Sequence, residues 1–221
     1  MKDLVIFGAG DLAEVAWAYY SRDSDYRIAA FTVDDQYASA EEFRDCPLVP
    51  FSTVLHRYPP QSHDLFVAMG FKNLNHARAD VYQRCKAMGY TLASYISSKI
   101  SECGHWSVGD NCFILEQSVI QPFVRIGNNV VIWSANHIGH HSVIGDHCFL
   151  SSQVAISGRC KIGDYTFMGV NASTAHGVTI GSDCLIGAGA NILKDTRDGE
   201  FYPGEGAKAS RIPALRAARV L

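Results

Sequence analysis

The chain has 221 residues, 48% of them hydrophobic and 19% charged, so it is expected to form one large or two small soluble domains with an ample core. A formal net charge of −3 without a basic block excludes an electrostatic case for nucleic-acid binding. The absence of a long apolar run excludes a membrane span, and seven scattered cysteines favour a reduced, cytoplasmic protein.

Residues 1–98 alternate between strand and helix patterns. The run DLVIFG (3–8) ends in a glycine turn, so we interpret it as a first strand and not as a signal peptide. Residues 11–22 have helical spacing, and residues 26–33 and 63–70 have strand patterns. A second helix is predicted at 73–89 and a last strand at 90–98. This order predicts a small Rossmann-like parallel α/β domain over residues 1–98.

The motif GAGDLA (8–13) lies between the first strand and the first helix. Glycines there let the backbone approach a phosphate, and the helix N-terminus favours its charge. Asp34 and Asp35 end the next strand, where carboxylates suit ribose hydroxyls. Only one mononucleotide-binding half fits in this region, so a nucleoside diphosphate sugar suits it better than NAD; a purely structural glycine turn is the alternative. The predicted binding residues are Gly8, Gly10, Asp11, Leu12, Asp34 and Asp35.

From Ser107 to Thr196 the sequence divides into fifteen uninterrupted hexads. The second position is aliphatic in fourteen of them, and the sixth is mostly small or β-branched. This pattern predicts a parallel β-helix of about five triangular coils, with the second and sixth positions pointing inward. The α/β domain and the tail after Thr196 are expected to cover its two ends. Cysteines 112, 148, 160 and 184 fall on the small inward position, as core residues.

Together, GAGDLA and the hexads make the chain resemble the nucleotide-sugar N-acetyltransferases of the left-handed β-helix class, in the sialic acid O-acetyltransferase-like group. The resemblance implies an α/β domain (1–98), a left-handed β-helix with a tail (99–221) and a homotrimer with active sites between subunits. It also implies acetyl-CoA as donor and the amine of a nucleotide-linked deoxyamino sugar as acceptor, in cytoplasmic synthesis of surface glycans such as O-antigen or glycoprotein.

The segment NHIGHHSVIGDH (136–147) contains five histidines. Because one coil takes eighteen residues, His140 is expected to stack against Gly158 at an outward turn. A base beside a backbone N–H is what acyl transfer requires. The resemblance places the catalytic histidine on His140 and the oxyanion glycine on Gly158. Relatives often have a carboxylate after that histidine; His141 stands there and is the alternative base.

Asn136 replaces a small inward residue, so it is a candidate for organising the site, whereas His137 and His147 are expected to be solvated. The remaining candidates come from the resemblance. Lys72 and Asn73, and more weakly Arg78, would line the sugar pocket. CoA would contact Gly158, Val170, Ala188 and Lys208.

Three other functions remain open from the sequence. The chain could O-acetylate sialic acid or another sugar, or it could be a non-catalytic sugar-binding trimer. It could also be a zinc enzyme similar to γ-class carbonic anhydrases, because His105 and His141, like His140 and His176, lie 36 residues apart. The third ligand would then fall on Asp146 or Gly181, neither of which is a histidine, so no metal is expected.

Overall fold

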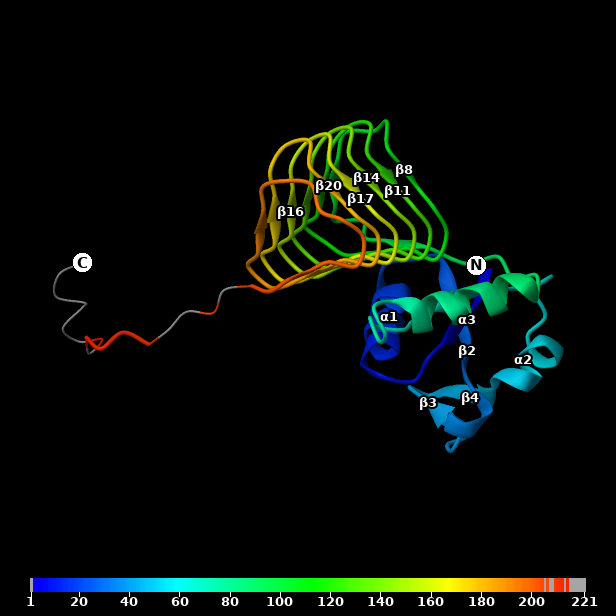
Figure 1. Cartoon of the computed structure of the whole chain (residues 1–221). Coiled ribbons are helices and arrows are strands. Elements are labelled where there is room, and N and C mark those ends of the chain that lie inside the picture. Colours follow the sequence, from blue (N-terminus) through cyan, green and yellow to red (C-terminus); the bar gives the residue numbers. More distant parts are fainter. Residues whose placement is uncertain (1, 205, 207–208, 213, 215–221) are drawn as a thin grey trace.

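The computed structural model describes residues 2–204, 206, 209–212 and 214. A small α/β domain is followed by a parallel β-helix, one flat side of which faces the domain (Figure 1). Within the described residues, no helix combines the length and the apolar character needed to cross a membrane.

The N-terminal sheet has five strands in the order β3-β4-β2-β1-β5. Four of them are parallel, and β3 pairs antiparallel with β4. The strands are β1 (Lys2–Phe7), β2 (Tyr26–Val33), β3 (Glu42–Phe43), β4 (Cys46–Pro50) and β5 (His63–Val67); the helices are α1 (Asp11–Arg22), α2 (Phe51–Arg57), α3 (His76–Ala87) and the short 3-10 helix η1 (Asp35–Tyr37). The predicted α/β character is confirmed, while β3, β4 and α2 were not predicted.

Each face of this sheet is covered by a different partner. On one face, Val5, Phe7 and Leu65 pack against α2 and α3. On the other, Leu4, Ile6 and Phe66 pack against α1 and against outward side chains of the β-helix, including Phe113. The β-helix therefore replaces a second helix on that face, and the two regions share one apolar cluster.

The β-helix consists of three parallel sheets. The base sheet, which contacts the α/β domain, has seven strands: β6 (Tyr95–Ile96), β9 (Phe113–Ile114), β12 (Val131–Ile132), β15 (Phe149–Leu150), β18 (Phe167–Met168), β21 (Leu185–Ile186) and β23 (Phe201–Tyr202). The second sheet has β7 (Ser101–Glu102), β10 (Val119–Ile120), β13 (His137–Ile138), β16 (Ala155–Ile156), β19 (Ser173–Thr174) and β22 (Asn191–Ile192). The third has β8 (Ser107–Val108), β11 (Arg125–Ile126), β14 (Val143–Ile144), β17 (Lys161–Ile162) and β20 (Thr179–Ile180).

The hexad positions have the predicted roles. The aliphatic second-position residues and the four cysteines form a buried cluster inside the prism. The fifth position has a positive φ, between 51° and 76°, in every hexad from Asn111 to Gly189. A left-handed residue at each corner turns the chain sharply and lets the next strand stack on the coil before it.

The ends of the β-helix differ from the prediction. Its first strand, β6, precedes residue 99, and Ile96, Ile100 and Trp106 pack against the first coils of the core. The α/β domain covers the base sheet, so the prediction that it caps an end is wrong. At the other end β23 pairs with β21, and Tyr202 packs against the core, so residues after Thr196 complete the last coil.

His147 is buried, with 5% of its surface exposed, so the prediction that it is solvated is wrong. It belongs to a column in which the Asn111 amide bonds Asn129 (2.8 Å) and the Asn129 amide bonds His147 Nδ1 (2.9 Å). Tyr165, in the next coil, lies over its ring at 4.8 Å. Burial lowers the pKa of His147, with Asp146 opposing this effect.

Arg78 is also structural and not a pocket residue. Its guanidinium is fully buried and donates to the carbonyls of Asn129, His147 and Cys148. Burial lowers its pKa to about 10. Arg78 therefore joins α3 to the β-helix, and the weak prediction that it contacts the sugar is wrong.

His147→Asn should reduce the pH dependence of stability. A histidine whose pKa is lowered by folding stabilises the native state above its unfolded pKa and loses that contribution as pH falls. Asparagine already occupies this turn in the two preceding coils, at φ 51° and 55°. The free energy of unfolding, measured by urea denaturation at pH 7.5 and 5.5, should fall less in the variant than in the wild type. Equal falls would show that His147 protonates as readily in the folded chain as in the unfolded one.

Candidate functional site

A cavity of about 700 Å³ lies where the glycine turn, the end of β5 and the base sheet meet. Of the predicted nucleotide-sugar residues, it is lined by Gly8, Gly10, Asp11, Leu12, Asp34 and Lys72. The structure therefore brings together residues from three separate segments of the α/β domain. Most of the remaining lining is apolar, as in small-molecule sites generally.

The glycine turn is shaped by backbone contact. Gly8 has φ 129°, and a Cβ built on it would lie 2.6 Å from the Ala68 carbonyl oxygen. Gly10 is the N-cap of α1, and nothing lies within 4 Å of a Cβ built there. The first N–H groups of a helix have no intrahelical acceptor and favour an anion. The turn thus leaves open space at the positive end of α1.

Two predicted residues do not line this cavity. Asp35 accepts hydrogen bonds from the N–H and the hydroxyl of Ser52 at the start of α2, and it lines a neighbouring hollow with Arg84. Asn73 is exposed, with φ 52°. Asp34 lies between the two hollows, and its carboxylate accepts a hydrogen bond of 2.5 Å from Arg84.

The sequence analysis missed the cavity wall contributed by the β-helix. Trp133, directly after β12, and Phe149 of β15 line the cavity, as do Tyr37 and Phe71. Trp133 stands at the third position of its hexad, where most hexads have glycine or serine. A tryptophan at this position was a sequence signal for a special role, but the sequence does not reveal that Trp133 faces the cavity.

The histidine corner comprises the stacked turns 121–124, 139–142, 157–160 and 175–178, which join the second sheet to the third. Here the eighteen-residue stacking brings His140 onto Gly158. A Cβ built on Gly158 would lie 2.6 Å from His140 Nε2. The His140 N–H donates to Gln121 Oε1 (2.8 Å), and His176 lies beyond, with ring centroids 6.0 Å apart. Within the described chain, no acceptor is recorded for the Gly158 N–H.

His141 follows at the left-handed turn position, with φ 60°. Its Nδ1 lies 3.1 Å from His140 Nδ1, and its ring lies 4.7 Å from that of Phe123. Desolvation lowers the pKa of His141, and the charges of Arg159 and His140 act in the same direction. The two histidines are therefore in contact through their Nδ1 atoms, and His140 presents Nε2 to Gly158.

Asn136 does not reach this corner. It lies at the turn between the base and second sheets, at the other end of β13, and is 1% exposed. Its amide donates to the Trp133 carbonyl and accepts from the Val154 N–H (3.0 Å), so backbone groups satisfy it. These hydrogen bonds tie adjacent coils together, so the structure does not place Asn136 beside His140, where it was predicted to organise the site.

Val170 and Ala188 are exposed and stack at the corner between the base and second sheets, one corner away from His140. Lys208 lies outside the described residues. Within one chain, the predicted CoA-contacting residues Val170 and Ala188 therefore lie apart from the predicted base, His140.

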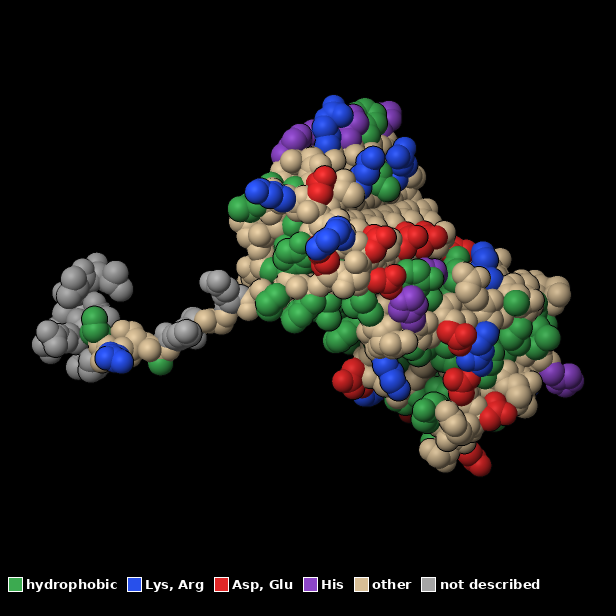
Figure 2. Space-filling model, viewed as in Figure 1, with side chains coloured by type: hydrophobic (Ala, Val, Ile, Leu, Met, Phe, Trp, Pro, Cys, Tyr) green, Lys and Arg blue, Asp and Glu red, His purple; other side chains and the backbone are tan. Residues whose placement is uncertain are grey.

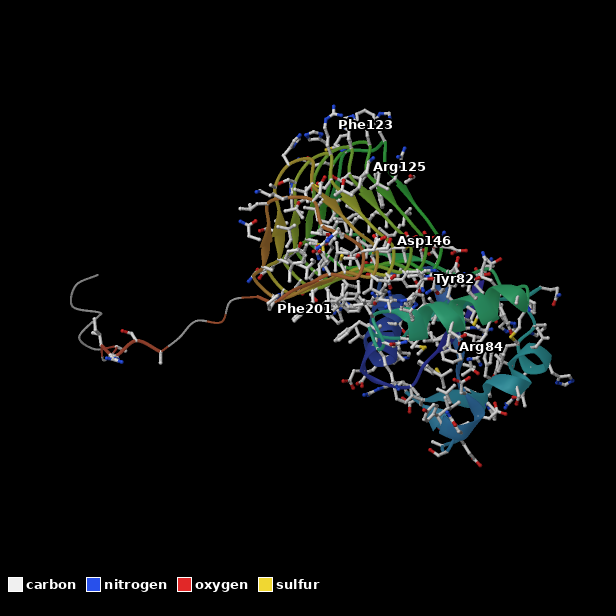
Figure 3. All side chains as sticks on the ribbon, viewed as in Figure 1. Tyr82, Arg84, Phe123, Arg125, Asp146 and Phe201 are labelled. Atoms are coloured by element: carbon white, nitrogen blue, oxygen red, sulfur yellow. The ribbon has the colours of Figure 1, made fainter. Side chains whose placement is uncertain are left out.

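The cavity and the histidine corner lie on different sides of the chain. The cavity opens against the base sheet, whereas the histidine corner joins the other two sheets. Figure 3 shows Phe123, the neighbour of His141, at the edge of the β-helix farthest from the α/β domain. Histidine, lysine and arginine side chains gather along that edge in Figure 2. A single chain thus presents two separate candidate half-sites.

In the described part of the chain, no group of three or more His, Cys, Asp or Glu side chains is arranged to hold a metal ion. The thiols of Cys112 and Cys148 are buried in the prism, which raises their pKa to about 12. Neither histidine pair spaced by 36 residues belongs to such a group among the residues that the structure describes.

Comparisons with known proteins show what the chain is similar to. Residues 107–140, 124–158 and 159–194 match the family model described as bacterial transferase hexapeptide (six repeats). No curated protein matches the chain. PerB from Caulobacter crescentus, solved with CoA and GDP-perosamine, has 25% identity and a TM-score of 0.81, over 91% of this chain and 93% of that one.

Two further structures have the same fold. The acetyltransferase domain of PglB from Neisseria gonorrhoeae FA1090 has 22% identity and a TM-score of 0.78, over 91% of this chain and 96% of its own. WeeI from Acinetobacter baumannii AYE has 13% identity and a TM-score of 0.60, over 91% of this chain and 96% of its own. The predicted fold, an α/β domain followed by a left-handed β-helix, is confirmed, as is the resemblance to nucleotide-sugar N-acetyltransferases of this class.

Gly158→Ala should move the His140 imidazole without unfolding the chain. The added methyl would lie 2.6 Å from Nε2, and the end of a flexible side chain can rotate away. We expect the thermal midpoint to change by less than about 3 °C, since little core is disturbed. A crystal structure of the variant should show the ring displaced; an unmoved ring would mean that the contact is looser than described.

Proposed function

We propose, from the hexapeptide-repeat transferase region and its two half-sites, that the chain is an acetyl-CoA-dependent N-acetyltransferase. It moves the acetyl group to the amine of a nucleotide-linked deoxyamino sugar, releasing free CoA thiol. The observation that carries this proposal is the contact of His140 Nε2 with Gly158, whose N–H has no recorded acceptor within the described chain. A base and a free donor at one point suit amine attack on a thioester.

The reaction proceeds by direct attack, without an acyl-enzyme. His140 Nε2 takes a proton from the attacking amine. The Gly158 N–H donates a hydrogen bond to the thioester oxygen as negative charge develops there. Collapse of the tetrahedral intermediate breaks the C–S bond and forms the amide, and the proton held by His140 passes to the leaving sulfur, so CoA departs as the thiol.

The cavity beside the glycine turn holds the nucleotide part of the acceptor. The diphosphate lies against Gly8 and Gly10 at the N-terminus of α1, with Lys72 as the nearby cation. Asp34 accepts from ribose hydroxyls. The wall formed by Trp133 and Phe149 contacts apolar parts of the ligand.

The active site is completed by a second copy of the chain, in a homotrimer. One chain separates its cavity from His140, so a neighbour's histidine corner supplies the base. Apolar side chains of the base sheet that the α/β domain leaves uncovered, such as Leu185 (36% exposed) and Phe201 (63%), suit contact with another subunit. CoA lies between subunits, along the exposed column of Val170 and Ala188.

The relatives guide the choice of substrates. PerB was solved with CoA and GDP-perosamine, and the PglB domain with acetyl coenzyme A. We therefore propose GDP-, UDP- and dTDP-linked amino sugars as the acceptors to screen, and a cytoplasmic role in surface glycan synthesis.

His140→Asn should lower kcat at least about a hundredfold, because the variant has no base at this position. Thiol release from acetyl-CoA with the preferred nucleotide amino sugar measures this rate. Circular dichroism should show an unchanged fold. Near-normal turnover would remove His140 from the role of base.

Gly10→Asp should raise the KM for the nucleotide sugar at least about tenfold over Gly10→Asn, since only the aspartate repels a diphosphate. Both residues are good N-caps, so α1 remains intact in each variant. The KM for acetyl-CoA should be the same in both. Equal sugar KM values would favour an acceptor without a nucleotide, such as a free sugar that is O-acetylated.

A further inference from the structure

The contact between His140 and His141 joins two imidazoles where a base and a carboxylate would be the simpler pair. Their Nδ1 atoms are 3.1 Å apart, and their rings are nearly perpendicular, at 88°. At this distance and orientation one nitrogen carries a proton and the other accepts it. The contact therefore fixes the tautomers of both rings.

The direction of the hydrogen bond follows from the other end of His140. Its Nε2 lies against Gly158, where a base must present a lone pair. An imidazole with a lone pair on Nε2 carries its proton on Nδ1, so His140 Nδ1–H donates to His141 Nδ1. His141 accordingly carries its own proton on Nε2.

We propose that His141 is a positioning residue that holds His140 in the Nδ1–H tautomer through a neutral histidine pair. This inference rests on the proposed acetyl transfer and goes beyond it, since it assigns the base to His140 and the acceptor role to His141. It also sets the condition under which the pair works, because a protonated His141 has no lone pair to offer.

The surroundings of His141 favour its neutral form and fix its position. Phe123 lies against its ring from the coil before, and Arg159 occupies the same turn position in the coil after. Desolvation lowers the pKa of His141. The charged and titratable groups that face it, Arg159 and His140, lower that pKa further. The backbone fixes its position through the His141 N–H, which donates to the Pro122 carbonyl (3.1 Å).

Substitutions at His141 can be matched for backbone strain. The chain already has asparagine, alanine and aspartate at this left-handed position in other hexads: Asn129 at φ 55°, Ala135 at φ 63° and Asp183 at φ 55°. His141→Asn, His141→Ala and His141→Asp should therefore fold equally well. They differ in what they offer to His140 Nδ1–H: a neutral acceptor, no acceptor and a charged acceptor.

Each variant has its own expected result. His141→Asn should keep kcat within about threefold of the wild type, because the amide oxygen accepts the same proton. His141→Ala should lower kcat at least about tenfold with both KM values unchanged. His141→Asp should keep activity but move the acid limb of kcat/KM to higher pH by about one unit, since a carboxylate favours the imidazolium. Alanine acting like the wild type, or an unmoved acid limb in the aspartate variant, would overturn the proposal.

A second measurement does not depend on activity. In ¹⁵N-histidine NMR spectra of the wild type and His141→Asn at pH 8, the His140 signals should show a protonated Nδ1 and an unprotonated Nε2. His141→Ala should shift His140 toward a mixture of tautomers. A wild-type His140 protonated on Nε2 would refute the pair even if acetyl transfer occurs. Failure of every nucleotide amino sugar to release thiol would instead refute the proposed function and leave the tautomer result standing.

Discussion

The left-handed residue at the fifth position of each hexad, from Asn111 to Gly189, is the constraint on which the rest of the molecule depends. It closes each coil after eighteen residues and aligns equivalent turns along the axis. Turn N–H groups bond to the coil before, as when Arg159 N–H donates to the His140 carbonyl (2.8 Å). This ladder holds the His140 ring on Gly158 and sets His141 between Phe123 and Arg159, so the chemistry of the corner follows from the period of the backbone.

The same repeat gives each corner of the prism a different use. The corner between the third and base sheets joins the domains through Arg78, His147 and the asparagine column. The histidine corner carries the proposed base, His140, and the proposed donor, the Gly158 N–H. The corner between the base and second sheets is exposed at Val170 and Ala188. Since the cavity faces the base sheet, the proposed reaction needs a second subunit to bring base and acceptor together.

The sequence predicted those features that repeat. The hexad register gave the inward residues and the stacking of His140 on Gly158, and the glycine motif gave one wall of the cavity. Features that depend on how the two regions pack could not be predicted. Trp133 lines the cavity and His147 is buried only because the α/β domain covers the base sheet and adjoining corner, which no local pattern encodes. Asn136 looked functional because a buried amide needs partners, but those partners are backbone groups of adjacent coils.

Complementation between two impaired variants, one in the base and one in the cavity, tests the shared site most directly. His140→Asn and Gly10→Asp subunits would be mixed by co-expression and assayed at a low concentration of the nucleotide sugar. If each site takes its cavity from one chain and its base from another, about a quarter of all sites formed by random assembly are intact, one in each mixed trimer, and activity returns. If each chain forms its own site, every site keeps one defect and the mixture stays as inactive as the separate variants.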